Sequence, residues 1–146
     1  MSFTIDLQNF KSKVEARANA VVRKIVLDVG TALVLKSPVG DASYWTHPAP
    51  PGYVGGRFRA NWQYGLDVPT GALPDIDANG GNTIGRISAN IATDAAGRVH
   101  YLVNKLPYGP ALEHGWSRQA PQGMVGLTVL QFQKTVQDAA QALKNT

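Results

Sequence analysis

Apolar residues recur at spacings of three and four through residues 6–36, which places them along one side of an α-helix. This stripe consists of Leu7, Phe10, Val14, Ala18, Val21, Ile25, Val29 and Ala32, and Val22, Val26 and Leu33 widen it in its second half. The helix ends at Ser37-Pro38, because the proline ring disfavours the α conformation in the residue before it. Such a helix would span about 46 Å, whereas a compact domain of this size is about 38 Å across. We therefore expect it either to kink, at Gly30, or to overhang its own domain and leave an apolar stripe that needs a partner.

Alternation of apolar and polar positions predicts two strands, at residues 58–68 and 98–104. The first strand carries Trp62 on its apolar face, and we expect this ring in the core. Between them, residues 83–93 contain isoleucines whose spacing fits either a short helix or a strand. We favour the helix.

Two further helical segments are predicted towards the C-terminus. Residues 108–114 form one or two turns closed by Gly115, and residues 121–143 form a longer helix that starts at Pro121. The apolar stripe of the longer helix is Val125, Val129, Phe132, Val136, Ala139 and Leu143. This order of elements predicts one α+β domain over residues 1–146, in which the long N-terminal helix and the C-terminal helix pack on a small, mainly antiparallel sheet.

Residues 37–57 form a long Pro/Gly-rich segment, which cannot sustain a helix or a central strand. The segment nevertheless contains Tyr44, Trp45 and Tyr53. Loops of this length inside small domains are usually functional or disordered. The aromatic rings favour function, so we predict an extended docking loop.

Charged residues are scarce in this chain. They make up only 16% of its 146 residues, where about 25% is usual, so either small polar side chains or another subunit must cover the surface. This favours a protein that assembles. The net charge of +4 includes no basic run longer than Arg23-Lys24 and is typical of many soluble proteins, with a path lined by DNA phosphates as the alternative. No apolar stretch approaches the roughly 18 residues of a membrane span, so we expect no membrane partner.

Residues suited to catalysis or ligand binding are few. The histidines are scattered along the chain, at His47, His100 and His114. The chain has no cysteine, which excludes disulfides and thiolate metal sites. Ser117 follows a helical turn and not a strand, so we expect it to bond local backbone and not to act as a nucleophile. The glycines of residues 80–85 predict a turn and not a phosphate loop. We expect no enzymatic activity, no metal and no cofactor.

What remains is a set of aromatic rings and arginines in or beside the loops, and such side chains are the usual anchors of protein interfaces. The alternative is that the rings pack the domain's own core. We expect Tyr44 and Trp45 to be anchors and Trp116 to stabilise the subunit. The candidate interface residues are Tyr44, Trp45, Tyr53, Arg57, Arg59, Tyr108, Glu113 and Trp116.

Two blocks of this sequence resemble a known family. The first comprises residues 37–40 (SPVG), 44–45 (YW), 50–53 (PPGY) and 55–62 (GGRFRANW). The second comprises residues 104–109 (NKLPYG), 112–117 (LEHGWS), 119–121 (QAP) and 123–125 (GMV). Together they resemble the neck and tail-completion proteins of tailed bacteriophages, also labelled minor tail or head–tail joining proteins. The similarity extends over most of the chain.

The resemblance implies a structural virion protein that is assembled in the host cytoplasm. Members of the family form a ring, commonly of six subunits, that closes the head-proximal end of the tail tube. The ring joins the tube to the connector proteins beneath the capsid, and DNA passes through its lumen. In such a ring, the long helix would pack across a neighbour and the Pro-rich loop would reach an adjacent ring. The alternatives are a subunit of the connector or stopper layer and a DNA-binding module without sequence specificity.

Overall fold

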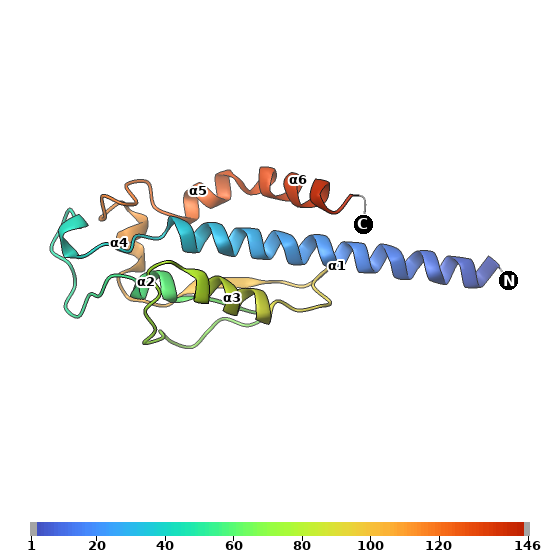
Figure 1. The fold of residues 1–146 in the computed structure, drawn as a ribbon, viewed down its shortest axis with the longest axis horizontal. Coiled ribbons are helices and arrows are strands. Elements are labelled where there is room, and N and C mark those ends of the chain that lie inside the picture. The colour runs from blue at the N-terminus through green and yellow to red at the C-terminus, as the bar shows by residue number, and fades with distance from the viewer. Residues whose placement is uncertain (1–2, 145–146) are drawn as a thin grey trace.

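The computed structural model describes the backbone of residues 3–144 and the side chains of residues 13–144. Its first element, α1 (Phe3–Lys36), has 34 residues and is therefore about 51 Å long. The helix continues through Gly30, and Figure 1 shows α1 without a kink and projecting beyond the rest of the fold. The expected overhang is therefore observed and the expected kink is not. Leu7 and Phe10 of the predicted stripe lie outside the described side chains.

Apolar residues lie on two sides of α1, and the two sides are buried to different degrees. Val26, Leu33 and Val34 are 7%, 5% and 0% exposed and belong to the core. Val26 and Leu33 are among the residues predicted to widen the stripe, whereas Val34 was not predicted. Val21 and Ile25 of that stripe are only half-buried, and Val14 is 50% exposed. The helix thus has one face against the body of the domain and a second apolar face that its own chain covers incompletely.

Gly30 has a packing role in place of the kink. A β-carbon at this position would lie 3.3 Å from Cγ2 of Ile87 and 3.4 Å from Cδ2 of Leu102. Ile87 belongs to α3 (Gly81–Asn90) and Leu102 to β2 (Tyr101–Asn104). The missing side chain therefore lets α1 lie directly on these two elements.

The predicted strand 58–68 is a short helix followed by a short strand. After α2 (Arg57–Ala60), the chain turns at Asn61 and continues as β1 (Trp62–Gly65). Asn61 is fully buried, and its side chain bonds the backbone of Arg57 and Leu73. Phe58, Ala60 and Trp62 are all buried, as the alternating pattern predicted. The same predicted face included Tyr64 and Leu66, but Tyr64 is half-buried and Leu66 is 36% exposed. The predicted backbone conformation was wrong, because the turn depends on contacts that Asn61 makes with a distant loop.

The remaining predictions in the middle of the chain are largely confirmed. Residues 81–90 form the helix α3, and β2 pairs antiparallel with β1 in a two-stranded sheet, with Trp62 opposite Asn104. Strand β2, over Tyr101–Asn104, is shorter than the predicted strand 98–104. Helix α4 (Gly109–Glu113) is followed by Gly115 at φ 86°, the left-handed conformation that glycine adopts readily.

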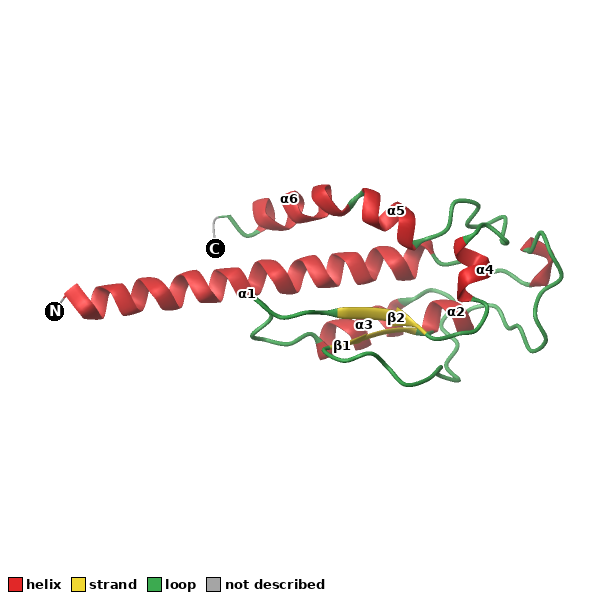
Figure 2. Ribbon diagram, turned by 180° about the vertical axis from the view of Figure 1, so that it is seen from behind, coloured by secondary structure: helices red, strands yellow, loops and turns green. Residues whose placement is uncertain are grey.

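The predicted C-terminal helix is two helices, α5 (Val125–Leu130) and α6 (Phe132–Ala142). Pro121 is not in either of them, because Gly123 at φ 78° keeps residues 121–124 in turns. Figure 1 shows α5 and α6 packed along one side of α1, with α3 and the sheet on another side. Figure 2 shows the same layers from behind, with the two strands close to α3. The fold is an α+β domain built from a long N-terminal helix, C-terminal helices and a small antiparallel sheet.

Candidate functional site

Three aromatic rings meet at the end of the domain opposite the projecting part of α1. The ring centroid of Trp45 lies 5.1 Å from that of Tyr53 and 5.9 Å from that of Tyr108. The centroids of Tyr53 and Tyr108 are 5.6 Å apart, and all three pairs meet edge to face, an arrangement that aromatic quadrupoles favour. We call this group, with the segments that carry it, the aromatic end.

Trp45 is a core residue and not the exposed anchor that the sequence suggested. Only 7% of it is exposed, because Tyr53 and Tyr108 enclose its ring. Trp116, expected to stabilise the subunit from within, is 37% exposed and stacks on His47 with ring centroids 4.1 Å apart. Tyr44 is 42% exposed. Of the three, Tyr44 and Trp116 are the rings that a partner could reach.

The Pro/Gly-rich segment 37–57 is built into the fold by hydrogen bonds to residues near Trp116. The backbone N–H of Thr46 donates to the carbonyl of Trp116 at 2.8 Å, and that of Arg118 donates to the carbonyl of Tyr44 at 2.7 Å. One side-chain oxygen of Gln119 accepts bonds from the N–H groups of Val39 and Gly40, at 3.0 and 2.7 Å. The hydroxyl of Tyr53 donates to Gly40 at 2.7 Å. These bonds hold the two sequence blocks together as one surface.

Arg59, a candidate interface residue, instead ties the end of α1 to the loop before α3. Its guanidinium donates to the carbonyls of Leu35, Ser37 and Ala78 at distances of 3.1, 2.8 and 2.9 Å. A cation at the C-terminal end of a helix also interacts favourably with the helix dipole. Burial lowers the pKa of Arg59, and the nearby carboxylate of Asp77 opposes that shift. Its role is structural.

Glu113, a second candidate, caps α5. Its carboxylate accepts hydrogen bonds from the backbone N–H groups of Met124, Val125 and Gly126 at 2.9, 2.9 and 3.0 Å. Burial alone would raise the pKa of this carboxyl group, but the three donors together hold the pKa below its ordinary value. Glu113 therefore fixes the start of α5 against α4, and its carboxylate is occupied within the chain.

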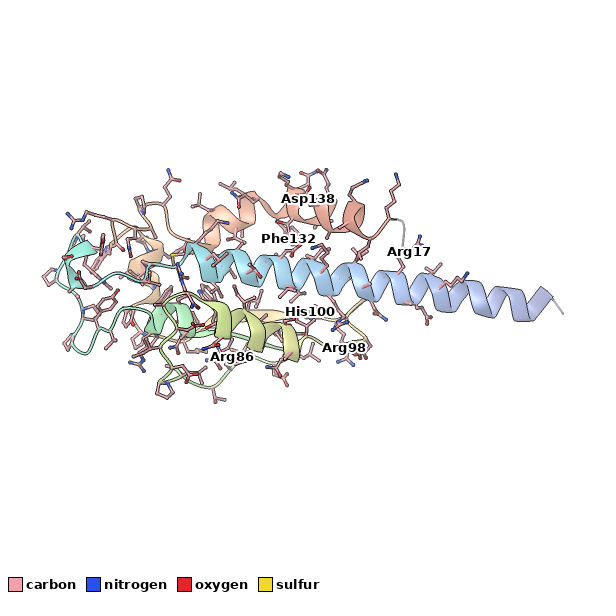
Figure 3. All side chains as sticks on the ribbon, in the orientation of Figure 1. Arg17, Arg86, Arg98, His100, Phe132 and Asp138 are labelled. Atoms are coloured by element: carbon pink, nitrogen blue, oxygen red, sulfur yellow. The ribbon has the colours of Figure 1, made fainter. Side chains whose placement is uncertain are left out.

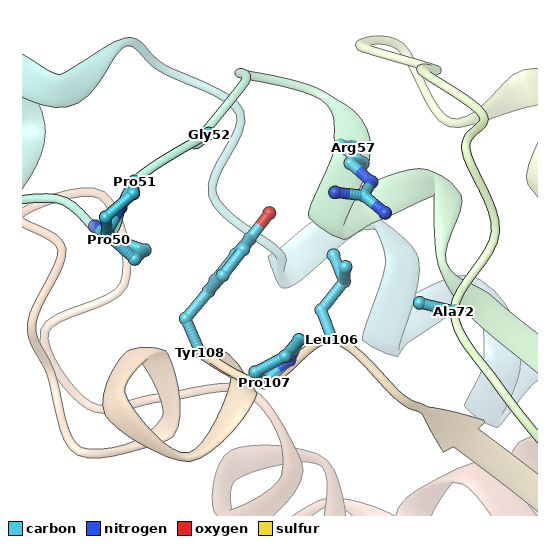
Figure 4. Close-up of a pocket in the computed structure, with 8 residues that line it drawn as sticks. All are labelled: Pro50, Pro51, Gly52, Arg57, Ala72, Leu106, Pro107 and Tyr108. Carbon is cyan, nitrogen blue, oxygen red and sulfur yellow. The ribbon is translucent and has the colours of Figure 1, made fainter.

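Arg57 and Tyr108 line a hollow of about 470 Å³ beside the aromatic end. The lining is completed by Pro50, Pro51, Gly52, Ala72, Leu106 and Pro107. Figure 4 shows the hydroxyl of Tyr108 and the guanidinium of Arg57 on the same side of this hollow. Arg57 donates through Nε to Leu73 at 3.2 Å, and the buried Tyr108 hydroxyl has no hydrogen-bond partner within the described structure. Proline rings and a single cation suit contact with another protein better than bond-making chemistry.

The histidines have separate structural partners. His100, which is labelled in Figure 3, bonds the hydroxyl of Tyr64 at 2.8 Å and the carbonyl of Ala95 at 2.9 Å. His114 contacts the carbonyl of Pro110 at 2.7 Å, and His47 stacks on Trp116 as described. The described residues contain no group of three or more metal-ligating side chains.

The other chemical candidates are also used within the fold. Ser117 is 1% exposed, and its hydroxyl accepts a bond from the N–H of Gln119 at 3.2 Å, which is the local role predicted for it. The glycines before α3 form a turn, with Gly80 at φ 81°. At that helix start, the carboxylate of Asp77 accepts bonds from the N–H and the hydroxyl of Thr83, each 2.7 Å long. The chain's own carboxylate thus lies where a bound anion would cap α3.

Two apolar faces away from the aromatic end are left uncovered. On α5 and α6, Val125, Val129 and Phe132 are 43%, 65% and 49% exposed, although their spacing predicted burial. The second is the face of α1 that includes Val14. Sequence analysis found both stripes and placed the first in the core, because a helical stripe alone does not say how far a neighbouring helix will reach along it.

None of the described helices is long and apolar enough to cross a membrane. Comparisons of the chain with protein-family models, curated proteins and solved structures found no match.

Proposed function

We propose that this chain is a structural virion protein of a tailed bacteriophage, a ring-forming neck or tail-completion subunit that caps the tail tube and joins it to the head connector. The observation that carries the proposal is the projection of α1 beyond its own domain. Helices in proteins gain most of their stability from packing, but the projecting part of α1 leaves apolar residues such as Val14 uncovered. A neighbouring copy in a ring would supply the missing layer.

The aromatic end supports the same proposal. The two blocks that resemble the neck and tail-completion family lie far apart in the sequence, yet they form one surface held by the bonds of Thr46, Arg118 and Gln119. Tyr44 and Trp116 are the exposed rings of this surface. In the proposed particle, this end faces an adjoining layer, either the tail tube or the connector.

The proposal specifies a homo-oligomer, commonly a hexamer for the resembling family, within the virion tail or neck and without catalysis or cofactor. The basic side chains of α1 include Lys13, Arg17, Arg23 and Lys24. Those that line the lumen would contact the phosphates of passing DNA without reading its sequence. Weak binding of this kind fits the lining of a channel, whereas tight DNA binding whose affinity falls steeply with added salt would favour the alternative, a DNA-binding module without sequence specificity.

Two measurements test the proposal. Light scattering and negative-stain microscopy of the pure protein, alone and with tail tubes, should detect rings. Particles that lack this protein should appear as full heads and separate tails. A protein that stays monomeric at high concentration and also fails to join tail tubes would overturn the proposal.

A further inference from the structure

The apolar stripe of α1 continues past the point where its own chain stops covering it. Val21 and Ile25 are half-buried in the region where α6 packs along α1. Val14 and Ala18 continue the same stripe at spacings of four and three and are exposed. Figure 1 shows why: α1 extends beyond the C-terminal end of α6. The uncovered stripe is therefore an extension of a helix–helix contact that already exists inside the subunit.

A second uncovered apolar face lies on α5 and α6. Val125, Val129 and Phe132 are exposed and follow the i, i+4, i+7 spacing of one helical face. Figure 3 labels Phe132. The segment 125–133 that carries them contains no charged residue. The cores of protein interfaces are depleted of charge in the same way. This face and the stripe on α1 thus have matching chemistry but lie on different parts of the subunit.

We propose that the projecting part of α1 in one copy packs against the α5–α6 face of the next copy. A second copy is the occupant that the geometry favours, because its α5–α6 layer would continue along α1 the layer that α6 begins. The two surfaces differ, so the contact is heterologous, and repeated heterologous contacts close into a ring when the rotation between copies allows it. This inference rests on the proposed function, since it names the contact that forms the ring.

The absence of native cysteine permits a direct test by crosslinking. The double variant Val14→Cys/Val129→Cys should form disulfides between copies and run as a ladder of multimers on a non-reducing gel, because a disulfide requires β-carbons about 4 Å apart. The matched control is Val14→Cys/Ile76→Cys, since Ile76 is also well exposed, at 59%, on a different surface. Each single-cysteine variant should yield dimers at most.

Charge insertion tests the same contact without new bonds. Val14→Lys and Val129→Lys should each lower the ring fraction at least tenfold at a fixed protein concentration, with thermal unfolding of the subunit unchanged. Ala16→Lys on α1 and Gln141→Lys on α6 add the same charge at exposed positions that lie roughly 120° or more around the helix from the uncovered apolar residues, and should leave rings intact.

The results distinguish this contact from the ring itself. Rings that persist in both lysine variants, or that crosslink no better through Val129 than through Ile76, would overturn the proposed contact and leave the ring proposal standing. Wild-type protein that forms no ring, either alone or on tail tubes, would overturn both.

Discussion

The indole N–H of Trp62 donates a hydrogen bond of 2.7 Å to the hydroxyl of Ser37, and both residues are buried. That hydroxyl donates in turn to the carbonyl of Leu33, also at 2.7 Å. Ser37 directly follows α1 and Trp62 begins β1, so the pair attaches the end of the long helix to the sheet. Arg59 binds the carbonyl of Ser37 from the other side.

Ser37→Ala should lower the free energy of unfolding by about 1–3 kcal/mol, because it leaves the buried indole N–H without an acceptor. Urea unfolding followed by tryptophan fluorescence and by circular dichroism measures this. In a Trp62→Phe background, the same serine substitution should cost much less. An equal cost in both backgrounds would mean that the hydrogen bond is not the cause.

Trp45→Ala should destabilise the subunit by about 3–5 kcal/mol, the usual cost of removing a large buried aromatic ring. Trp116→Ala should cost less than about 1 kcal/mol, because its ring is more than a third exposed, and should instead weaken joining to the partner layer. Thermal unfolding and a head–tail joining assay separate the two effects. Equal losses of stability would contradict the roles that burial assigns to these rings.

Glu113→Gln should destabilise the protein by about 1–2 kcal/mol at neutral pH, because a neutral amide caps α5 more weakly than a carboxylate does. The native pKa of Glu113 lies below its ordinary value of 4.5, so the carboxylate contributes stability above pH 4.5. That contribution disappears as the pH falls through the lowered native pKa.

Unfolding free energies of wild type and Glu113→Gln, measured from pH 7 to pH 3, should therefore converge at the acidic end. Asp67→Asn removes one exposed negative charge and serves as the control. A difference between wild type and Glu113→Gln that stays constant with pH would show that the cap does not depend on ionisation.

Gly123→Ala should destabilise far more than Gly52→Ala, although both glycines have φ 78°. A β-carbon at Gly123 would lie 2.3 Å from the carbonyl oxygen of Glu113, whereas nothing lies within 4 Å of one at Gly52. We expect about 1 kcal/mol at Gly52 from backbone strain, and at least about 2 kcal/mol more at Gly123 from the clash. Chemical denaturation measures the loss of unfolding free energy in each variant. Similar losses would contradict the close approach of residue 123 to the carbonyl of Glu113.

Most helices could be predicted from the sequence, because their apolar spacing and their Pro and Gly ends are local signals. The turn at Asn61 could not, since it depends on Leu73, twelve positions away in the chain. The sequence analysis predicted Trp45 as the exposed anchor and Trp116 as the stabilising ring, whereas Trp45 is buried and Trp116 is exposed. The reason is similar. Both rings lie beside Pro/Gly-rich loops, and which one is buried depends on whether Tyr53 and Tyr108 fold over it.

The candidate arginine and carboxylate show the same limit. Arg59 and Glu113 were selected as surface anchors because their residue types favour interfaces. Their partners are backbone groups of segments distant in sequence, Ala78 for one and Met124 to Gly126 for the other. Residue type alone does not reveal that a charged group is already bound within its own chain.

The unbroken course of α1 makes it a lever. Its root is clamped where Ser37, Arg59 and Trp62 meet, and its tip lies about 50 Å away. Because α3, α5, α6 and the sheet pack along α1, the helix moves with the body of the subunit. A rotation of the subunit by only about 5° about this end would displace the tip by about 4 Å, about three-quarters of the rise of one helical turn. Strain imposed at the aromatic end would thus reach the far end of the subunit as a displacement large enough to change which residues meet there.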